Sequence, residues 1–117
     1  ESMSKSVEQA TLGLVSIPAA YTPSEIAAAI KAGADYVKIF PADDLPRGYI
    51  KALKAVLPPD IAVFAVGGVT PENLAQWIDA GCAGAGLGSD LYRAGQTVER
   101  TAQQAAAFVK AYREAVQ

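Results

Sequence analysis

A lysine stands inside a short apolar segment, where a charged side chain is unusual. The segment Tyr36–Phe40 is rich in β-branched and aromatic residues and is closed by Pro41, which is typical of a buried strand. Burying an ammonium is costly unless it is paired, and desolvation of a lysine lowers its pKa and makes it a nucleophile for carbonyl carbons. Lys38 is therefore a candidate catalytic amine. A lysine whose stem packs while its ammonium reaches water explains the pattern equally well.

Two glycine-rich segments follow later apolar runs and predict a phosphate site. Gly67-Gly68 comes after the run 62–66, and Gly88-Ser89 comes after the run 83–87. Glycines let the backbone approach a ligand closely, and Gly88-Ser89 offers a free N–H and a hydroxyl. Adjacent glycine-rich loops of this kind are a recurrent phosphate site in (βα)₈ barrels. The alternative is that these glycines only permit tight turns and close helix packing.

The composition excludes several classes of protein. The chain has no histidine and one cysteine, Cys82, which rules out an internal disulfide and histidine-based catalysis and argues against a metal site. We interpret Cys82 as a small buried filler. The net charge of -2 and pI near 5.0 give no footprint for nucleic acid. With no membrane-spanning stretch and no signal-peptide pattern, we expect a cytoplasmic protein.

The chain repeats itself at an offset of 48 residues. Thr22-Pro23-Ser24-Glu25 matches Thr70-Pro71-Glu72-Asn73, and Ala32-Gly33-Ala34 matches Ala80-Gly81-Cys82. Each threonine can cap a helix that begins with proline, each glutamate complements the helix N-terminus, and each glycine fits the left-handed residue at its end. The repeat predicts the order strand-helix-strand-helix, occurring twice.

These signals place four strands and five helices along the chain. The strands are predicted at 14–17, 36–40, 62–66 and 83–87, and the helices at 2–10, 23–32, 49–56, 71–80 and 97–116. A leading helix followed by four βα units requires parallel strands with right-handed crossovers. We therefore predict one α/β domain over 1–117, which is either half of a (βα)₈ TIM barrel or a small open sheet.

The predicted strands direct the candidate residues toward a common edge. Ligands of parallel α/β folds bind beyond the carboxyl ends of the strands. Strand alternation puts Tyr36, Lys38 and Phe40 on one face and Val37 and Ile39 on the other. In a barrel one of these faces is the lumen, where an inward lysine near the top meets the phosphate loops. A lysine beside a phosphate cradle, without metal ligands, fits Schiff-base chemistry on a carbonyl.

With these motifs the chain resembles the KDPG/KHG aldolase family. The resemblance rests on the segment Val37–Ala42, on Gly67-Gly68-Val69 and on Gly88-Ser89, and it covers essentially the whole chain. Segments 49–53 and 66–73 are most similar to the 2-dehydro-3-deoxy-6-phosphogalactonate aldolase branch of that family. The resemblance implies the C-terminal half of a (βα)₈ barrel.

The resemblance also implies roles for individual residues. Lys38 takes the place of the Schiff-base lysine, and Phe40 takes that of the aromatic residue next to it. The phosphate-binding positions fall on Gly67, Gly68, Gly88 and Ser89. The implied reaction cleaves a phosphorylated keto acid, a 2-keto-3-deoxy-6-phospho sugar acid, to pyruvate and glyceraldehyde 3-phosphate. Neither a cofactor nor a metal is expected.

The sequence departs from the family pattern at two points. The family usually has Pro-Gly after its fifth strand, whereas this sequence has Pro18-Ala19, whose β-carbon could crowd the mouth of the site. The family's glutamate base and carboxylate-binding arginine lie on early strands that have no counterpart here. Asp43 and Asp44 are the only carboxylates placed to substitute, and we interpret both as solvated loop residues.

A second interpretation is non-catalytic, with the half-barrel acting as a structural or phosphate-binding module of natural or engineered origin. A half-barrel has two open sheet edges and an apolar lumen face. We therefore expect a homo-oligomer, or pairing with a missing N-terminal half-barrel. A second chain that supplies the early strands favours the enzyme, whereas a homodimer favours the module.

Overall fold

Four parallel strands form one sheet in the computed structural model, which describes residues 7–9 and 11–117. The sheet order is β1-β2-β3-β4, and each neighbouring pair is parallel. The strands are β1 (Ala19–Ala20), β2 (Tyr36–Ile39), β3 (Ala62–Val66) and β4 (Gly84–Gly86). The predicted α/β class with four parallel strands is confirmed.

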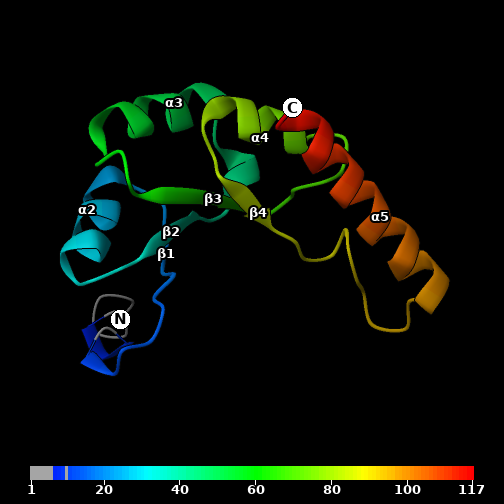
Figure 1. Ribbon diagram of the computed structural model, residues 1–117, viewed down its shortest axis with the longest axis horizontal. Helices are drawn as coiled ribbons and strands as arrows, with labels where there is room; N and C mark the ends of the chain where they lie inside the picture. Colours follow the sequence, from blue (N-terminus) through cyan, green and yellow to red (C-terminus); the bar gives the residue numbers. More distant parts are fainter. Residues whose placement is uncertain (1–6, 10) are drawn as a thin grey trace.

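Helices alternate with the strands and cover one side of the sheet. They are α2 (Pro23–Lys31), the short 3-10 helix η1 (Ala42–Asp44), α3 (Arg47–Val56), α4 (Leu74–Ala80) and α5 (Val98–Ala115). Helices α2, α3 and α4 lie along the outer side of the sheet, and α5 packs against α4 beyond β4 (Figure 1). Of the predicted leading helix at 2–10, residues 7–9 are helical, and 2–6 and 10 lie outside the described residues.

The first helix of the repeat begins as the sequence predicts. The Thr22 hydroxyl accepts from the N–H of Glu25 at 3.2 Å, and the Glu25 carboxylate accepts from the N–H of Thr22 at 3.0 Å. This reciprocal capping box satisfies two donors at the helix start. The hydrogen bonds from the N–H groups of Thr22 and Tyr21 lower the pKa of the Glu25 carboxyl. Glu25 therefore serves the helix N-terminus.

The second helix of the repeat starts later than predicted. Helix α4 begins at Leu74, with Asn73 at its N-cap, rather than at residue 71. Residues 71–73 form a turn in which Asn73 Oδ1 accepts from the Thr70 N–H at 2.9 Å, and the Thr70 hydroxyl accepts from the Asn73 N–H at 3.1 Å. The short asparagine side chain thus stabilises a turn at this point, a local bonding pattern that competes with the helix.

The first strand is shorter and later than predicted. The predicted strand at 14–17 is wrong in its bounds, because regular pairing is confined to Ala19–Ala20. The carbonyls of Ser16 and Pro18 still accept from the N–H groups of Tyr36 and Lys38, at 3.2 and 3.0 Å. Pro18 has no N–H to donate, so it interrupts the ladder at this sheet edge.

The two faces of the sheet differ sharply in burial. On β2, Val37 and Ile39 are fully buried under the helices, while Tyr36 is exposed and Lys38 is half-buried on the opposite face. This is the alternation that the sequence predicts. Cys82 is buried within the same core, and this burial raises the pKa of its thiol to about 11. Its interpretation as an apolar filler agrees with that position.

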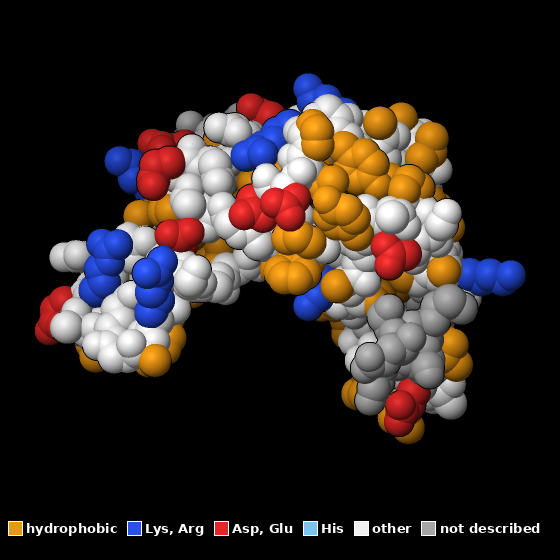
Figure 2. All heavy atoms as spheres, turned by 180° about the vertical axis from the view of Figure 1, so that it is seen from behind, with side chains coloured by type: hydrophobic (Ala, Val, Ile, Leu, Met, Phe, Trp, Pro, Cys, Tyr) orange, Lys and Arg blue, Asp and Glu red, His pale blue; other side chains and the backbone are white. Residues whose placement is uncertain are grey.

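The inner face of the sheet is open in the described part of the chain. The radius of gyration is 15.1 Å, whereas a compact chain of this length has about 13 Å. The accessible surface is 6997 Å², whereas a compact monomer of this mass exposes about 6,000 Å². Hydrophobic side chains gather at the roof of the resulting hollow (Figure 2). The structure is therefore an arch rather than a closed unit.

None of the described helices is long and apolar enough to cross a membrane.

Candidate active site

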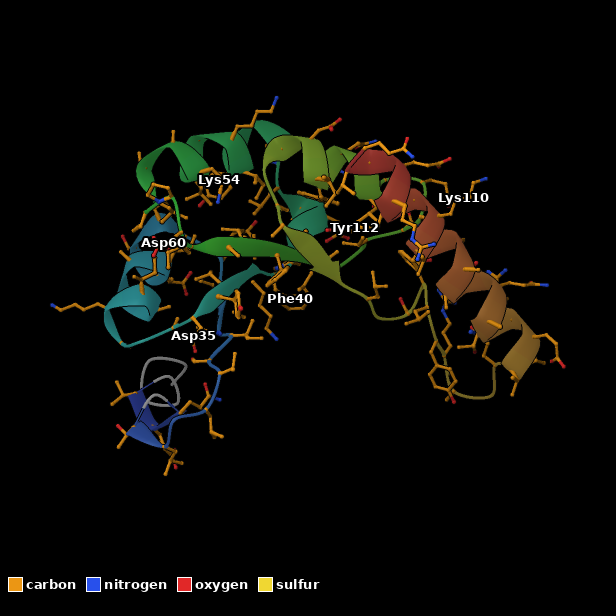
Figure 3. The ribbon with its side chains drawn as sticks, viewed as in Figure 1. Asp35, Phe40, Lys54, Asp60, Lys110 and Tyr112 are labelled. Atoms are coloured by element: carbon orange, nitrogen blue, oxygen red, sulfur yellow. The ribbon has the colours of Figure 1, made fainter. Side chains whose placement is uncertain are left out.

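Five of the predicted site residues line one pocket. The pocket has a volume of about 260 Å³ and lies at the carboxyl ends of β2, β3 and β4. Its predicted members are Phe40, Gly67, Gly68, Gly88 and Ser89, and it is completed by Val66, Val69, Gly86, Leu87 and Asp90. Phe40 projects from the end of β2 on the side away from α3 and α4 (Figure 3). The fold thus brings together residues from three separate βα connections.

Lys38 lies beside this pocket rather than in its wall. It precedes Phe40 by two residues on the same face of β2, a rise of about 7 Å along the strand. Its neighbours in register are Ala19 on β1 and Phe64 on β3. The exposed Ala19, where the family has glycine, thus stands next to the lysine. Lys38 is only half-buried, because no layer of described residues covers the inner face.

The connection after β3 requires glycine at both positions. Gly67 and Gly68 have φ angles of +105° and +71°, which side chains rarely adopt. A Cβ on Gly68 would also lie 2.5 Å from Oδ2 of Asp43. By contrast, a Cβ on Gly88 would meet nothing within 4 Å in the described structure. The space beside Gly88 is thus open to a ligand, and the conformation of this loop does not require a glycine here.

The carbonyl groups of Gly67 and Gly68 are held by donors outside the pocket. The oxygen of Gly67 accepts from the N–H of Asp43 at 3.2 Å. The oxygen of Gly68 accepts from the side-chain amide Nδ2 of Asn73 at 2.9 Å. Each hydrogen bond fixes the orientation of one peptide group in the loop.

The connection after β4 has the same arrangement. The oxygen of Gly88 accepts from the N–H groups of Leu91 and Tyr92, at 2.9 and 3.0 Å. The oxygen of Ser89 accepts from Nε of Arg93 at 3.1 Å. The carbonyl groups of both loops are therefore engaged, although the two loops belong to different βα units.

The four peptide groups held by these carbonyl hydrogen bonds also carry four backbone N–H groups. In a trans peptide the C=O and the following N–H point in opposite directions. The N–H groups opposed to the four carbonyls belong to Gly68, Val69, Ser89 and Asp90, which all line the pocket. Within the described ranges, none of these N–H groups has an acceptor. Successive free N–H groups around a concavity form an anion-binding nest.

The carboxylates near the pocket are in exposed or bordering positions. Asp43 and Asp44 are both exposed on η1, as predicted, and the side chain of Asp43 lies against Gly68. Asp90 borders the pocket and was not singled out from the sequence. Asn73 was also missed as a site residue. A signal for it exists, because Asn73 occupies the fourth position of the repeated motif, where the first copy has Glu25.

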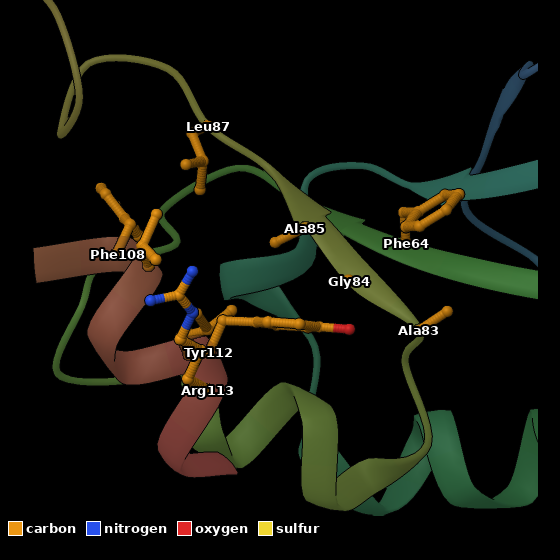
Figure 4. Close-up of a pocket in the computed structure, with 10 residues that line it drawn as sticks. Phe64, Ala83, Gly84, Ala85, Leu87, Phe108, Tyr112 and Arg113 are labelled. Atoms are coloured by element: carbon orange, nitrogen blue, oxygen red, sulfur yellow. The ribbon is translucent and has the colours of Figure 1, made fainter. Parts of the chain in front are cut away.

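A larger apolar groove lies between β4 and α5. It has a volume of about 480 Å³, and its lining includes Phe64, Phe108 and Tyr112. Tyr112 extends from α5 into the space next to β4 (Figure 4). The N–H of Ala83 bonds to the oxygen of Val63 on β3 at 2.8 Å. Because backbone N–H and C=O groups alternate in direction along a strand, the N–H and C=O of Gly84 then point toward the groove.

Comparison with known protein families identifies the family of this chain. The family model for KDPG and KHG aldolase matches residues 2–107, so the chain belongs to the KDPG and KHG aldolase family. The resemblance noted in the sequence is confirmed.

Individual relatives match closely but are longer than this chain. The 2-dehydro-3-deoxy-6-phosphogalactonate aldolase of Escherichia coli (strain K12) is 75% identical over 105 residues, which are 90% of this chain and 51% of that protein. A solved structure described as native KDPGal superposes with a TM-score of 0.96 at 69% identity, covering 98% of this chain and 56% of the other. The chain spans about half the length of the curated relatives it matches.

A third relative is part of a designed assembly. It is a cube-shaped protein cage made by fusing symmetric oligomeric domains, and it superposes with a TM-score of 0.93 at 68% identity. The match covers 97% of this chain and 42% of that one.

Proposed function

We propose that this chain carries the Schiff-base lysine and the phosphate cradle of a class I aldolase for a 2-keto-3-deoxy-6-phospho sugar acid. The observation that carries the proposal is the nest of four free N–H groups, in a pocket whose lining residue Phe40 follows Lys38 by two residues. A nest suits a phosphate, and a lysine suits a keto carbon. The name of the 75% identical relative supports the galactonate form of the sugar acid.

The proposed reaction begins at the amine of Lys38. Its nitrogen attacks the keto carbon, and loss of water gives a cationic iminium. The C–C bond next to the aldehyde product breaks, and its electron pair moves into the iminium. Glyceraldehyde 3-phosphate leaves, and the remaining enamine takes up a proton and is hydrolysed to pyruvate. The proton transfers require groups on the further strands of a complete barrel.

The cradle has a separate task in this scheme. Gly67-Gly68 and Gly88-Ser89 hold the phosphate, which does not react. Phe40 lines the same pocket and follows the lysine by two residues in the chain. Binding energy from the remote phosphate can thus position the keto carbon at the amine.

A second candidate function is a self-associating, non-catalytic module formed by a single domain over 1–117. Two open sheet edges and an exposed inner face favour it. The 68% identical relative within a cage of symmetric oligomeric domains also supports association.

For the enzyme, the partner that we propose is an N-terminal half-barrel supplying the early strands. A cytoplasmic location stays a prediction.

Inorganic phosphate should perturb a defined set of amide resonances. In a titration followed by amide NMR, we expect saturable shifts of Gly68, Val69, Ser89 and Asp90, because their N–H groups are free donors at one pocket. A crystal grown with sulfate should place the anion at the same amides. Shifts confined to surface lysines would contradict the cradle, and so would the absence of any saturable shift.

Replacing Gly68 by alanine should weaken this binding. The substitution combines a φ of +71° with a Cβ placed against the Asp43 side chain, so the loop must change its path. We expect phosphate affinity to fall by at least about tenfold, which corresponds to about 1.4 kcal/mol. The matched control is Gly48→Ala, because a Cβ at that helical position meets nothing within 4 Å. Normal phosphate binding by Gly68→Ala would overturn the assigned loop geometry.

A further inference from the structure

We propose that Asn73 is a positioning residue of the phosphate cradle, because its side-chain amide sets the direction in which the N–H of Val69 points. The inference rests on the proposed function, and it makes the Asn73 side chain responsible for the orientation of the Val69 N–H. The contact that carries it is the hydrogen bond from Asn73 Nδ2 to the oxygen of Gly68, at 2.9 Å. That oxygen and the N–H of Val69 belong to the same trans peptide, so holding one orients the other.

The side chain of Asn73 is itself held in place. Its Oδ1 accepts from the N–H of Thr70 at 2.9 Å, and its own N–H donates to the Thr70 hydroxyl at 3.1 Å. The bond to Oδ1 fixes the plane of the side-chain amide, and the bond from the backbone N–H holds the main chain of Asn73. Nδ2 is then the amide group that faces Gly68. Asn73 therefore links the start of α4 to the glycine loop through its side-chain amide.

The two copies of the internal repeat provide a natural comparison. In the first copy, Glu25 occupies the position of Asn73 and its Oε1 accepts from the N–H of Thr22 at 3.0 Å. In both copies the side-chain oxygen thus accepts from the threonine three residues earlier. A carboxylate has no donor, whereas the amide has one in addition. The second copy, which has this amide donor, is also the copy whose preceding loop carries the free N–H groups of Gly68 and Val69 at the anion pocket.

The simpler explanation is that Asn73 serves only as a cap residue, and two substitutions separate the two roles. Asn73→Asp keeps the oxygen that accepts from Thr70 and removes the donor to Gly68. Asn73→Ala removes both and adds no charge, so it controls for repulsion between an aspartate and phosphate. Glu25→Gln is the matched control, because it changes the equivalent residue in the first repeat.

The measurement is the dissociation constant of inorganic phosphate on the full chain, determined from the amide shifts. We expect both Asn73 variants to bind phosphate about tenfold more weakly, since one orienting hydrogen bond is lost. Glu25→Gln should bind like the unsubstituted chain. Trapping of pyruvate on Lys38 should not change, because pyruvate has no phosphate. A role limited to folding would instead lower trapping and the thermal midpoint together with phosphate affinity.

The possible failures are distinguishable. Phosphate binding by Asn73→Ala within about twofold of the unsubstituted chain would overturn the role of Asn73 and leave the cradle intact. If Asn73→Ala does not fold, the same result with Asn73→Asp overturns it. Absence of phosphate binding in the unsubstituted chain would overturn the proposed cradle itself.

Discussion

At micromolar concentration we expect this chain, studied alone, to sediment as a dimer or a larger species. The sheet ends at β1 on one side and β4 on the other, and unpaired parallel edges favour association. Large apolar side chains are also exposed, Ile17 just before β1 at 44% and Phe40 at the end of β2 at 52%. The accessible surface exceeds that of a compact monomer by about 1,000 Å², and one side of a standard interface buries about 800 Å².

The partner that we expect is a second copy. A two-fold axis parallel to the strands would place β1 of one copy beside β4 of the other, and the reverse, with all eight strands parallel. Both edges are then paired at once, and both inner faces line a shared interior. The apolar groove between β4 and α5 would receive the edge segment of the second copy, which includes the exposed residues Val15 and Ile17.

Ile17→Lys should shift the chain toward the monomer. It places an ammonium on the edge segment, where association would bury it, and we expect the dissociation constant to rise by at least about tenfold. Val56→Lys is the control, because Val56 is 76% exposed at the C-terminal end of α3, where a cation is favourable. A clean monomer of the unsubstituted chain, with its inner face protected, would mean an open α/β rearrangement. The aldolase interpretation of the isolated chain would then fail.

The alternation of buried and exposed residues could be read from the sequence because it follows from strand geometry alone. Val37 and Ile39 face the helices and Lys38 faces away, as the pattern on 36–40 predicts. The glycines at helix ends were predictable for the same local reason, since Gly33 and Gly81 adopt φ angles of +103° and +115°. These features depend on neighbours in the chain rather than on tertiary contacts.

Other features depend on groups that are distant in sequence. The burial of Lys38 could not be judged from its strand, because it depends on what covers the inner face. The start of α4 was misplaced, since the motif ending in Asn73 looks like a helix start but forms a turn first. The hydrogen bond from Asn73 to Gly68 was missed because the sequence does not show which carbonyl oxygen a side-chain amide contacts.

Lys38→Arg should abolish Schiff-base formation with pyruvate. Arginine keeps the positive charge and a similar length, but it stays protonated and cannot form an imine. The lysine is placed between Ala19 and Phe64 in the sheet register, so the substitution changes chemistry more than packing. Lys54 is a useful control, because its amine already donates to the oxygen of Ile61 at 3.0 Å. Lys54→Arg should leave the adduct unchanged.

The role of Lys38 is tested most directly by locating the pyruvate adduct. The chain is incubated with pyruvate, reduced with borohydride and digested, and the modified peptide is identified by mass spectrometry. We predict one adduct, on Lys38, which disappears in Lys38→Arg. An adduct distributed over Lys31, Lys51, Lys54 and Lys110, or one that persists in Lys38→Arg, would contradict the claim that this half-barrel carries the aldolase lysine.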